Sequence, residues 1–131
     1  MQKSDCIFCK IIKGEIPSYK IYEDEDFFAF LDINPMHPGH TLLLPKEHQG
    51  YVFDIDDLLY SKLFKTAKKL SVKLKKVTQA KKIGLAIEGI SVDHVHLHLV
   101  PVNNGNDLDP CLAKKADQKE LEDLAKKLRS M

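Results

Sequence analysis

The sequence lacks long apolar segments and any large excess of charge, and each absence excludes a class of protein. No stretch approaches the roughly 20 apolar residues of a membrane-spanning helix, and residues 1–5 contain no apolar signal-peptide core. Twenty Lys and Arg residues against nineteen Asp and Glu residues give a net charge of +1, which provides no electrostatic footprint for nucleic acid. We therefore expect a soluble, cytoplasmic protein that binds neither membranes nor nucleic acid and acts on a small ligand.

Cysteine is also scarce. The three cysteines are an odd number in a chain with few loops, which argues against a disulfide framework and favours reduced thiols or a metal site. With 131 residues, 44% of them hydrophobic, the chain can bury one sizeable core but is too short for two ordinary domains. It contains no internal repeat. We therefore expect a single domain over residues 1–131.

Short apolar segments bounded by turn-forming residues predict five β-strands. They are residues 19–22, 27–31, 40–45, 83–87 and 91–102. Residues 54–78 contain neither Gly nor Pro and repeat Leu or Ala at intervals of three and four, which predicts one long amphipathic helix. Because most connections between the strands are short, we expect an α+β fold, with a five-stranded antiparallel sheet and the helices packed on one side.

Two aspartates are predicted to begin the helices. Asp54 is expected to cap the long helix, because an Asp side chain at this position accepts a free backbone N–H. Asp117 is followed three residues later by Glu120, a pattern typical of a helix start. Leucines at helical spacing follow it, so a C-terminal helix is expected at residues 117–129.

Three histidines, His94, His96 and His98, occupy alternate positions in an apolar segment. Side chains alternate between the two faces of a strand, so the imidazoles are expected on one face and Val95 and Leu97 on the other. The outer two histidines would then be rooted about 13 Å apart, too far for one metal ion to bind all three. An elongated polar ligand fits better, and the middle histidine is the natural nucleophile, because neutral imidazole attacks phosphorus readily.

The segment His-Val-His-Leu-His-Leu-Val at residues 94–100 resembles the signature of the histidine-triad (HIT) nucleotide-binding family. The resemblance extends from Cys6 to Pro101 and includes Phe-Leu-Asp-Ile-Asn-Pro at residues 30–35 and Pro-Gly-His-Thr at residues 38–41. It implies the α+β fold of that family and the homodimer that its members usually form.

The resemblance also implies a hydrolase that acts on the α-phosphate of purine nucleoside phosphoramidates or of nucleotide esters and anhydrides. His96 would attack the phosphorus and form a nucleotidyl-histidine, while His98 would assist the leaving group and position the phosphate. His40 matches a supporting histidine of the family. The nucleotidyl-transferase branch generally lacks a histidine at the position of His98, so the chain resembles the hydrolases.

A nucleotide pocket is implied by the same resemblance, with Asp32 accepting the ribose hydroxyls and Ser91 at the phosphate. Its apolar wall would consist of Phe8, Ile11, Ile16, Ile21, Phe30, Leu31 and Ile33. Each of these apolar residues could equally be ordinary core. The chain departs from the family at residues 87–92, a shortened loop with Ile87 in the position of a phosphate-binding Asn. The loss of one such donor can lower the rate about 100-fold, so slow turnover is one expectation.

Cys6 and Cys9 form a Cys-x-x-Cys motif, a spacing shared by zinc half-sites and redox sites. In family members that carry this pair, histidines matching His48 and His94 complete a zinc site, so the resemblance implies a structural Zn²⁺. A redox site, which usually follows a strand, and unliganded thiols are the alternatives. Cys111 is predicted to be an incidental thiol, and no organic cofactor is expected.

Two other functions remain open at the level of sequence. One is a purine-nucleotide binding or regulatory module with little turnover, which the altered loop at residues 87–92 favours. The other is metal-dependent hydrolysis, in which His94 and His96 chelate a catalytic ion. It is the weaker alternative, because no nearby downstream Asp or Glu offers a further ligand.

Overall fold

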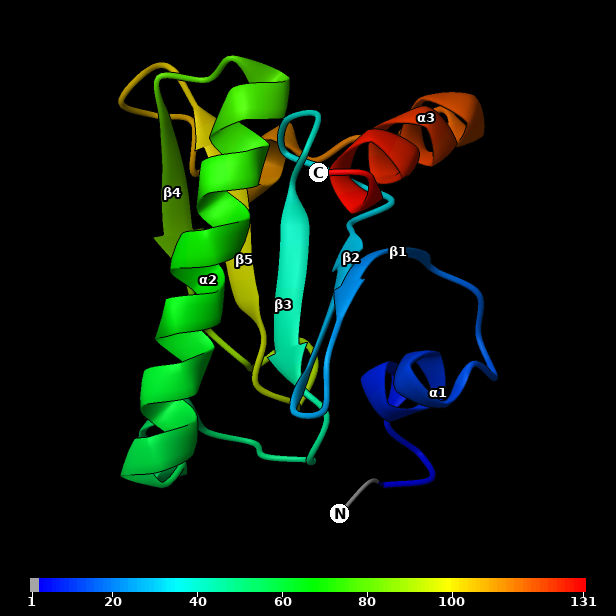
Figure 1. Cartoon of the computed structure of the whole chain (residues 1–131), viewed down its shortest axis with the longest axis vertical. Helices are drawn as coiled ribbons and strands as arrows, with labels where there is room; N and C mark the ends of the chain where they lie inside the picture. Colours follow the sequence, from blue (N-terminus) through cyan, green and yellow to red (C-terminus); the bar gives the residue numbers. More distant parts are fainter. Residues whose placement is uncertain (1–2) are drawn as a thin grey trace.

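The computed structural model describes residues 3–131 and contains a five-stranded antiparallel sheet with α-helices on both of its faces (Figure 1). The strands are β1 (Tyr19–Glu23), β2 (Phe27–Leu31), β3 (Thr41–Pro45), β4 (Lys82–Ala86) and β5 (Leu97–Val102), in the order β1-β2-β3-β5-β4. The helices are α1 (Ile7–Lys13), α2 (Asp57–Thr78) and α3 (Gln118–Arg129). The predicted α+β fold with five antiparallel strands is confirmed.

The first two strands form the hairpin that the sequence predicts. Asp24 closes its turn, because the Oδ1 atom accepts the backbone N–H groups of Asp26 at 2.8 Å and of Phe27 at 2.7 Å. Every residue of β2 and β3 is buried, so both faces of this central part of the sheet are covered.

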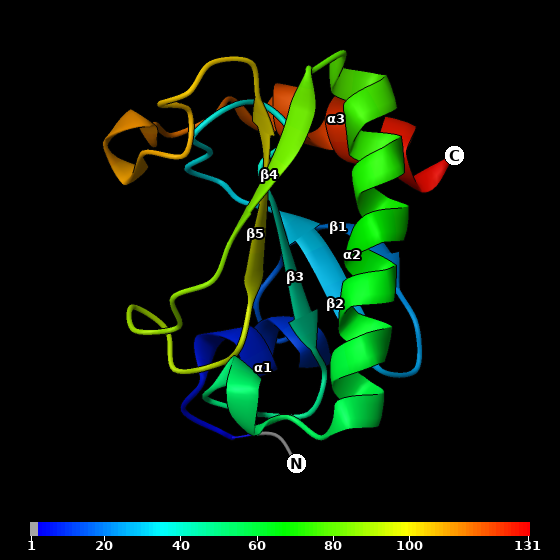
Figure 2. The same cartoon turned by 90° about the vertical axis from the view of Figure 1, so that its left-hand side faces the viewer.

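One face of the sheet is covered by α2 and α3. Leu63 and Leu70 of α2 and Leu121 of α3 belong to one buried cluster with Leu97 and Leu99 of β5. Helix α2 lies in front of the sheet in the view of Figure 1, and Figure 2 shows it running along one side of the strands. The apolar stripes predicted from the spacing of leucines therefore form the main core.

The opposite face carries α1, a helix that the sequence pattern did not predict. Phe8 and Ile11 of this helix pack against Phe30, Leu42 and Leu44 of β2 and β3 in a second buried cluster. The expectation that the helices pack on one side of the sheet is therefore wrong for α1. A sheet whose central strands are apolar on both faces needs such a second cover.

Helix α2 begins two residues later than predicted. Asp56, not Asp54, is the N-cap, and its side chain accepts the backbone N–H of Leu59 at 2.9 Å. Asp54 instead ends the one-turn helix η1 (Val52–Asp54), which forms because Val52 is buried in the main core. The predicted cap of α3 is confirmed, since the Asp117 side chain accepts the N–H of Glu120.

Strand β5 is shorter than the predicted strand over residues 91–102, because it begins at Leu97. The preceding segment is held by loop contacts: the N–H of His94 bonds to the carbonyl of Val92, and the N–H of Val95 bonds to that of Gln49. His94 and His96 therefore precede the strand. The predicted alternation still holds, since Val95 and Leu97 lie in the main core and the histidines do not.

The segment after β5 passes over the same side of the sheet as α1 and contains the one-turn helix η2 (Pro110–Leu112) (Figure 2). It then pairs with the segment that follows β2, because the N–H of Lys114 bonds to Pro35 and that of Ala116 bonds to Ile33. These contacts fix the loop that follows Asp32. Within residues 3–131, no helix has the length and apolar character needed to cross a membrane.

Candidate functional site

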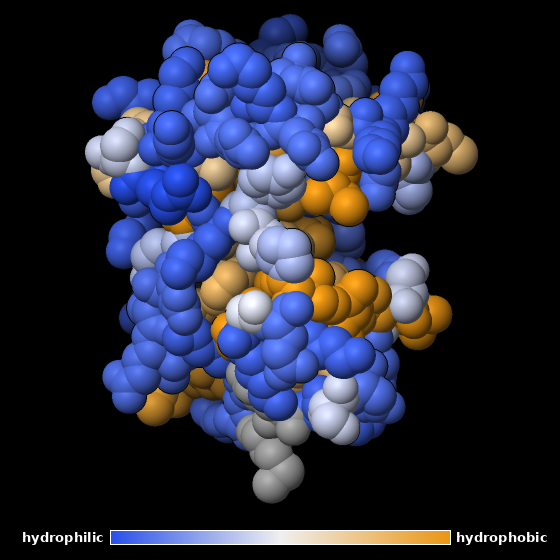
Figure 3. Space-filling model, turned by 90° about the vertical axis from the view of Figure 1, so that its right-hand side faces the viewer, coloured by the Kyte–Doolittle hydropathy of each residue, from blue (hydrophilic) through white to orange (hydrophobic). Residues whose placement is uncertain are grey.

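A largely apolar pocket of about 530 Å³ lies on the α1 side of the sheet. It is bounded by α1, by the end of β2, by β5 and by the loops that follow β4 and β5. Apolar side chains surround a recess on the face shown in Figure 3, between the α1 end of the molecule and the end that carries α3. A pocket with an apolar wall and few polar groups is typical of a small-molecule site.

Most of the residues predicted for the nucleotide site line this pocket. They are Phe8, Ile11, Ile16, Phe30, Leu31, Asp32, Ile33, Ser91, His96 and His98. Ile21 is the exception, because it lies in the main core under α2 and α3, on the other face of the sheet. Its assignment to the pocket is therefore corrected. The irregular register of β1 between Lys20 and Tyr22 makes the direction of this side chain hard to predict from simple alternation.

Several residues of the pocket were not predicted. They are Ile7, Pro17, Ser18, Met36, Leu42, Ala86, Glu88, Val92, Leu108 and Pro110. Leu108 and Pro110 come from the polar loop after β5, and they reach the pocket because Leu108 packs against Gly84 of β4, where a Cβ atom would lie only 3.0 Å from the leucine side chain. The signals that the sequence offered were an apolar residue, Leu108, within a polar loop and a glycine within a predicted strand.

His96 is buried at the base of the pocket, with 3% of its surface exposed. Its Nδ1 atom lies 2.7 Å from the carbonyl oxygen of His94, and because a carbonyl only accepts, Nδ1 carries the proton. In the neutral ring, Nε2 therefore holds a free lone pair. The ring of Phe8 meets the imidazole edge-on at a centroid distance of 4.9 Å, which fixes its orientation. This arrangement prepares Nε2 for nucleophilic attack.

His98 and His40 form a hydrogen-bonded pair beside His96. The Nδ1 atom of His40 accepts the backbone N–H of Met36 at 3.0 Å, so the proton of the neutral ring is on Nε2. This N–H donates to Nδ1 of His98 at 2.9 Å. In neutral His98 the proton is consequently on Nε2, which makes this ring a donor toward the pocket.

Burial keeps both rings of this pair neutral. Desolvation is the main cause that lowers the pKa of His40 and of His98 to about 4, and the neighbouring histidines add to the effect. At neutral pH the pair is therefore a set of uncharged, oriented hydrogen-bond groups.

Asp32 stands at the edge of the pocket where β2 ends. Its Oδ1 atom accepts the N–H of Asn34 at 2.8 Å, and its Oδ2 atom lies 3.7 Å from Nε2 of His40. Because Nε2 of His40 makes its shorter contact with His98, Oδ2 of Asp32 is available to accept hydrogen bonds from a ligand. Burial raises the pKa of this carboxyl group above its usual value.

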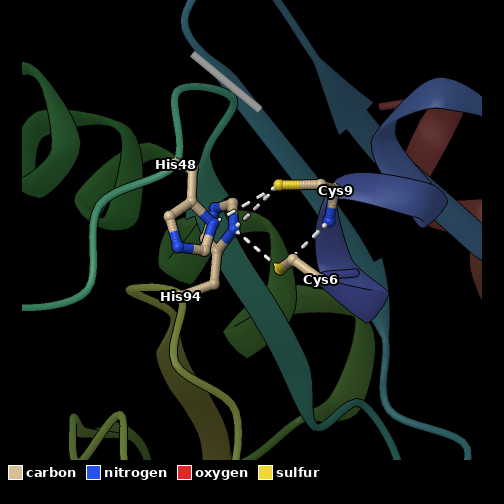
Figure 4. Close-up of side chains that lie close together, drawn as sticks. All are labelled: Cys6, Cys9, His48 and His94. Atoms are coloured by element: carbon tan, nitrogen blue, oxygen red, sulfur yellow. Dashed lines mark hydrogen bonds between the residues drawn. The ribbon is translucent and has the colours of Figure 1, made fainter. Parts of the chain in front are cut away.

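A second cluster is formed by Cys6, Cys9, His48 and His94, whose side chains point toward one another (Figure 4). Their ligand atoms all lie within 4.8 Å of one another. Nδ1 of His94 is 3.4 Å from the sulfur of Cys6 and 3.5 Å from that of Cys9, and Nδ1 of His48 is 3.4 Å from the sulfur of Cys9. With the usual Zn–S and Zn–N bond lengths, a sulfur and a nitrogen ligand at two corners of a tetrahedron around zinc lie about 3.5 Å apart. The donor set and spacing fit Zn²⁺.

The surroundings of this cluster favour a cation as well. Nε2 of His94 donates to the carbonyl oxygen of Pro45 at 2.8 Å, which turns the lone pair of Nδ1 toward the thiols. Burial lowers the pKa of His94 to about 4, so the ring is a neutral ligand. Burial also raises the pKa of the Cys9 thiol, which disfavours the thiolate. A bound cation would stabilise the thiolate and offset this effect.

The hydrogen bonds argue against two other metal sites. Both ring nitrogens of His94 already have partners, the thiol of Cys6 and the carbonyl of Pro45, and Nδ1 of His96 is used by a carbonyl, so the two histidines do not form a chelate. Asp32, His40 and His98 are also close enough to share an ion. However, if neutral His40 bound an ion through Nε2, its proton would be on Nδ1. This proton would face the backbone N–H of Met36, so the hydrogen bond between them would be lost.

Comparison with known proteins identifies the family. A family model described as the HIT domain matches residues 13–105, which is more than half of the chain. The chain belongs to the HIT family. Adenosine 5'-monophosphoramidase HNT1 of Saccharomyces cerevisiae is 44% identical over 97 residues, which cover 73% of this chain and 61% of that protein.

Solved structures of HIT proteins have the same fold. A Hit-like protein involved in cell-cycle regulation from Bartonella henselae superposes with a TM-score of 0.84 at 33% identity, covering 99% of this chain and 98% of that chain. A Zn-bound histidine triad family protein from Mycobacterium smegmatis superposes with a TM-score of 0.81 at 31% identity, covering 96% and 91%. The resemblance recognised in the sequence is therefore confirmed at the level of the family.

Proposed function

We propose that this HIT protein is a nucleotide hydrolase that cleaves the bond between the α-phosphate of a purine nucleoside monophosphate and its leaving group. Phosphoramidates are the preferred substrates, and esters or anhydrides are the related ones. The observation that carries the proposal is the set of hydrogen bonds made by the histidines, in which Nδ1 of His96 is bonded to a carbonyl oxygen and Nδ1 of His98 to His40. In the neutral rings, these bonds leave a free Nε2 lone pair on His96 and an Nε2–H donor on His98. The similarity to a yeast adenosine 5'-monophosphoramidase supports the same class of reaction.

The reaction proceeds in two displacements. Nε2 of His96 attacks the α-phosphorus, the new N–P bond forms, and the bond to the leaving group breaks while Nε2–H of His98 donates to the departing atom. The departing group thereby takes the Nε2 proton of His98. Water then attacks the same phosphorus and returns one proton to Nε2 of His98, the N–P bond breaks, and the nucleoside monophosphate leaves with His96 restored. His40 acts through His98, because its proton determines which nitrogen of His98 is the donor.

The nucleoside is held on the side of the pocket where β2 ends. The apolar side chains of Phe8, Ile11, Ile16 and Ile33 would contact the base, and Oδ2 of Asp32 would accept the ribose hydroxyls. The apolar wall excludes water from the base, while the carboxylate gives the ligand one fixed orientation. We assign Ser91, which also lines the pocket, to the phosphate.

We also propose that Cys6, Cys9, His48 and His94 hold a structural Zn²⁺. Four protein ligands leave no open position for a substrate, so the ion supplies stability and no chemistry in the reaction. The site would tie the start of α1 to the loop that precedes His96, and would thereby fix the wall of the pocket. A zinc-bound relative from Mycobacterium smegmatis supports this assignment.

Covalent trapping tests the proposed mechanism. Adenosine phosphoramidate labelled with ³²P in its phosphate is mixed with the protein, quenched within milliseconds and analysed by mass spectrometry after proteolysis at neutral pH, where phosphorus–nitrogen bonds survive. The expected result is an adenylate on the peptide that contains His96, and its absence from the His96→Ala protein is the control. Turnover with no adduct at any quench time contradicts the mechanism.

One observation favours the second candidate, a nucleotide-binding module with little turnover. The Oε1 atom of Glu88 accepts the backbone N–H groups of Ile90 and Ser91, both at 3.0 Å, and these donors are then unavailable to a phosphate. In that case calorimetry should find nucleoside monophosphate binding without catalytic turnover of the phosphoramidate. The implied homodimer and the cytoplasmic location stay predictions, and the former is measured by light scattering.

A further inference from the structure

The charged side chains of the pocket are all of one sign. The pocket contains two carboxylates, Asp32 and Glu88, and among the described residues that line it there is neither lysine nor arginine. His98 is neutral at pH 7, since burial lowers its pKa to about 4. A site for an anionic phosphate is therefore built without a fixed cation and carries an excess of negative charge.

Glu88 is held in one place. Its Oε1 atom accepts two backbone N–H groups, those of Ile90 and Ser91, each at 3.0 Å. The same hydrogen bonds lower the pKa of the Glu88 carboxyl group, so this side chain is ionised at neutral pH. Burial and the neighbouring His96 lower the pKa of His98, and the charge of Glu88 opposes this lowering.

The sheet places the two carboxylates on opposite sides of the histidines. Asp32 follows β2, which is separated from β5 by β3, whereas Glu88 follows β4 on the other side of β5. His98 pairs directly with Ala86, two residues before Glu88. If a ligand holds its ribose at Asp32 and its phosphorus at His96, the part of the pocket that Glu88 lines is left for its leaving group.

We infer that Glu88 determines which leaving group the protein accepts. It favours substrates whose leaving group is an amine with a positively charged ammonium group at its free end, over those with an anionic leaving group. The inference rests on the proposed function and specifies its substrate class. Polyphosphate leaving groups are disfavoured, because they bring further negative charge against a fixed carboxylate. Glu88 is exposed, and an exposed charge pair changes a rate or binding constant by about two- to fivefold. The ratio between an attracted and a repelled leaving group combines two such factors and is about tenfold.

Three adenosine monophosphoramidates of similar size test this inference. Their amines are diaminopropane, whose free end is cationic, butylamine, which is neutral, and β-alanine, whose free end is anionic. Values of kcat/KM are measured for each with the wild-type protein and with Glu88→Gln, whose amide oxygen can still accept the N–H groups of Ile90 and Ser91. Glu122→Gln, on the exposed side of α3, is the control for a change in net charge.

The wild-type protein should prefer the cationic over the anionic leaving group by at least about tenfold. Glu88→Gln should reduce this ratio by about tenfold while changing the butylamine rate by less than about threefold. The preference should also weaken as salt is raised, because salt screens exposed charges. Glu122→Gln should leave the ratio unchanged.

Two results overturn the inference: an unchanged cation-to-anion ratio in Glu88→Gln, or equal losses for all three compounds, which would mean that Glu88 only supports its loop. Failure of the proposed function would look different, since the wild-type protein would then not hydrolyse the butylamine compound. Even in that case, calorimetry can measure the charge preference as binding. The dissociation constants of the three compounds are compared in the His96→Ala protein with and without Glu88→Gln.

Discussion

The Nε2 atom of His40 lies 2.9 Å from the Nδ1 atom of His98, although 58 residues separate them in the sequence. Since Nδ1 of His40 is occupied by the N–H of Met36, the hydrogen bond between the two rings has a single direction. The loop between β2 and β3 thus determines the protonated nitrogen of a histidine on β5. This relationship makes His40 a positioning residue whose effect on activity can be tested separately from that of His96.

Replacing His40 by Ala should lower kcat by about 10- to 100-fold with little change in KM, because His98 then loses the partner that fixes its tautomer. His40→Gln places an amide N–H near the former Nε2 position and should retain more activity than His40→Ala. Steady-state kinetics with adenosine phosphoramidate measure both. Equal activity of the two variants would contradict a role that depends on the donated proton.

Replacing His96 by Ala should lower the hydrolysis rate by more than about 1000-fold, since the loss of a covalent catalyst removes the reaction pathway. The fold should survive, because His96 makes its hydrogen bond only to a neighbouring carbonyl group. Single-turnover rates and circular dichroism are the measurements. A rate within about tenfold of wild type would show that His96 is not the nucleophile.

Replacing Asp32 by Asn should weaken the binding of adenosine monophosphate by about tenfold, because a charged acceptor for the ribose hydroxyls is lost. Dideoxyadenosine monophosphate, which lacks both hydroxyls, should bind the two proteins with similar affinity. Calorimetric titration of each nucleotide into each protein gives the four dissociation constants. An equal loss for both nucleotides would refute the contact with the ribose.

Protein purified without added metal or a metal column should contain about one zinc per chain. Cys6→Ser should lose most of the metal and melt several degrees lower, because the start of α1 is no longer tied to the loop before His96. Cys111, which is exposed and remote from the cluster, provides the matched control as Cys111→Ser. Absence of zinc from the wild-type protein, measured by plasma emission, would exclude the site.

The free energy of unfolding should decrease as the pH falls from about 6.5 toward 4. In the folded protein, burial holds the pKa of His40 and of His98 at about 4, below the value of 6.5 for an exposed histidine. The unfolded chain therefore binds more protons within this window, and stability is lost as the pH decreases through it, whereas it is fully present above pH 6.5.

Urea unfolding at pH 7 and at pH 5 measures this effect. His40→Gln should lose less stability between the two pH values than the wild-type protein, and both share the same zinc ligands, so metal release cancels in the comparison. Identical losses would show that His40 does not contribute.

Local patterns in the sequence accounted for much of the fold. The spacing of leucines predicted α2 and α3, and the alternation around His96 predicted which side chains face the core. These patterns are readable because a helix or strand that packs on one side repeats its apolar residues with the period of its own geometry. Helix α1 escaped prediction because seven residues are too few to display such a period.

The sequence by itself determined the fold class, the family and the face of the histidines, since each depends on residue types at fixed local spacing. Only the tertiary structure decided the rest: it brought Cys6 to His94, gave His98 its protonated nitrogen through His40, moved Ile21 into the main core and set Glu88 beside the pocket. These relationships join segments that are distant in the chain. Their geometry depends on how the layers pack and on which buried polar atoms must find a partner. Neither can be predicted from local patterns of neighbouring residues.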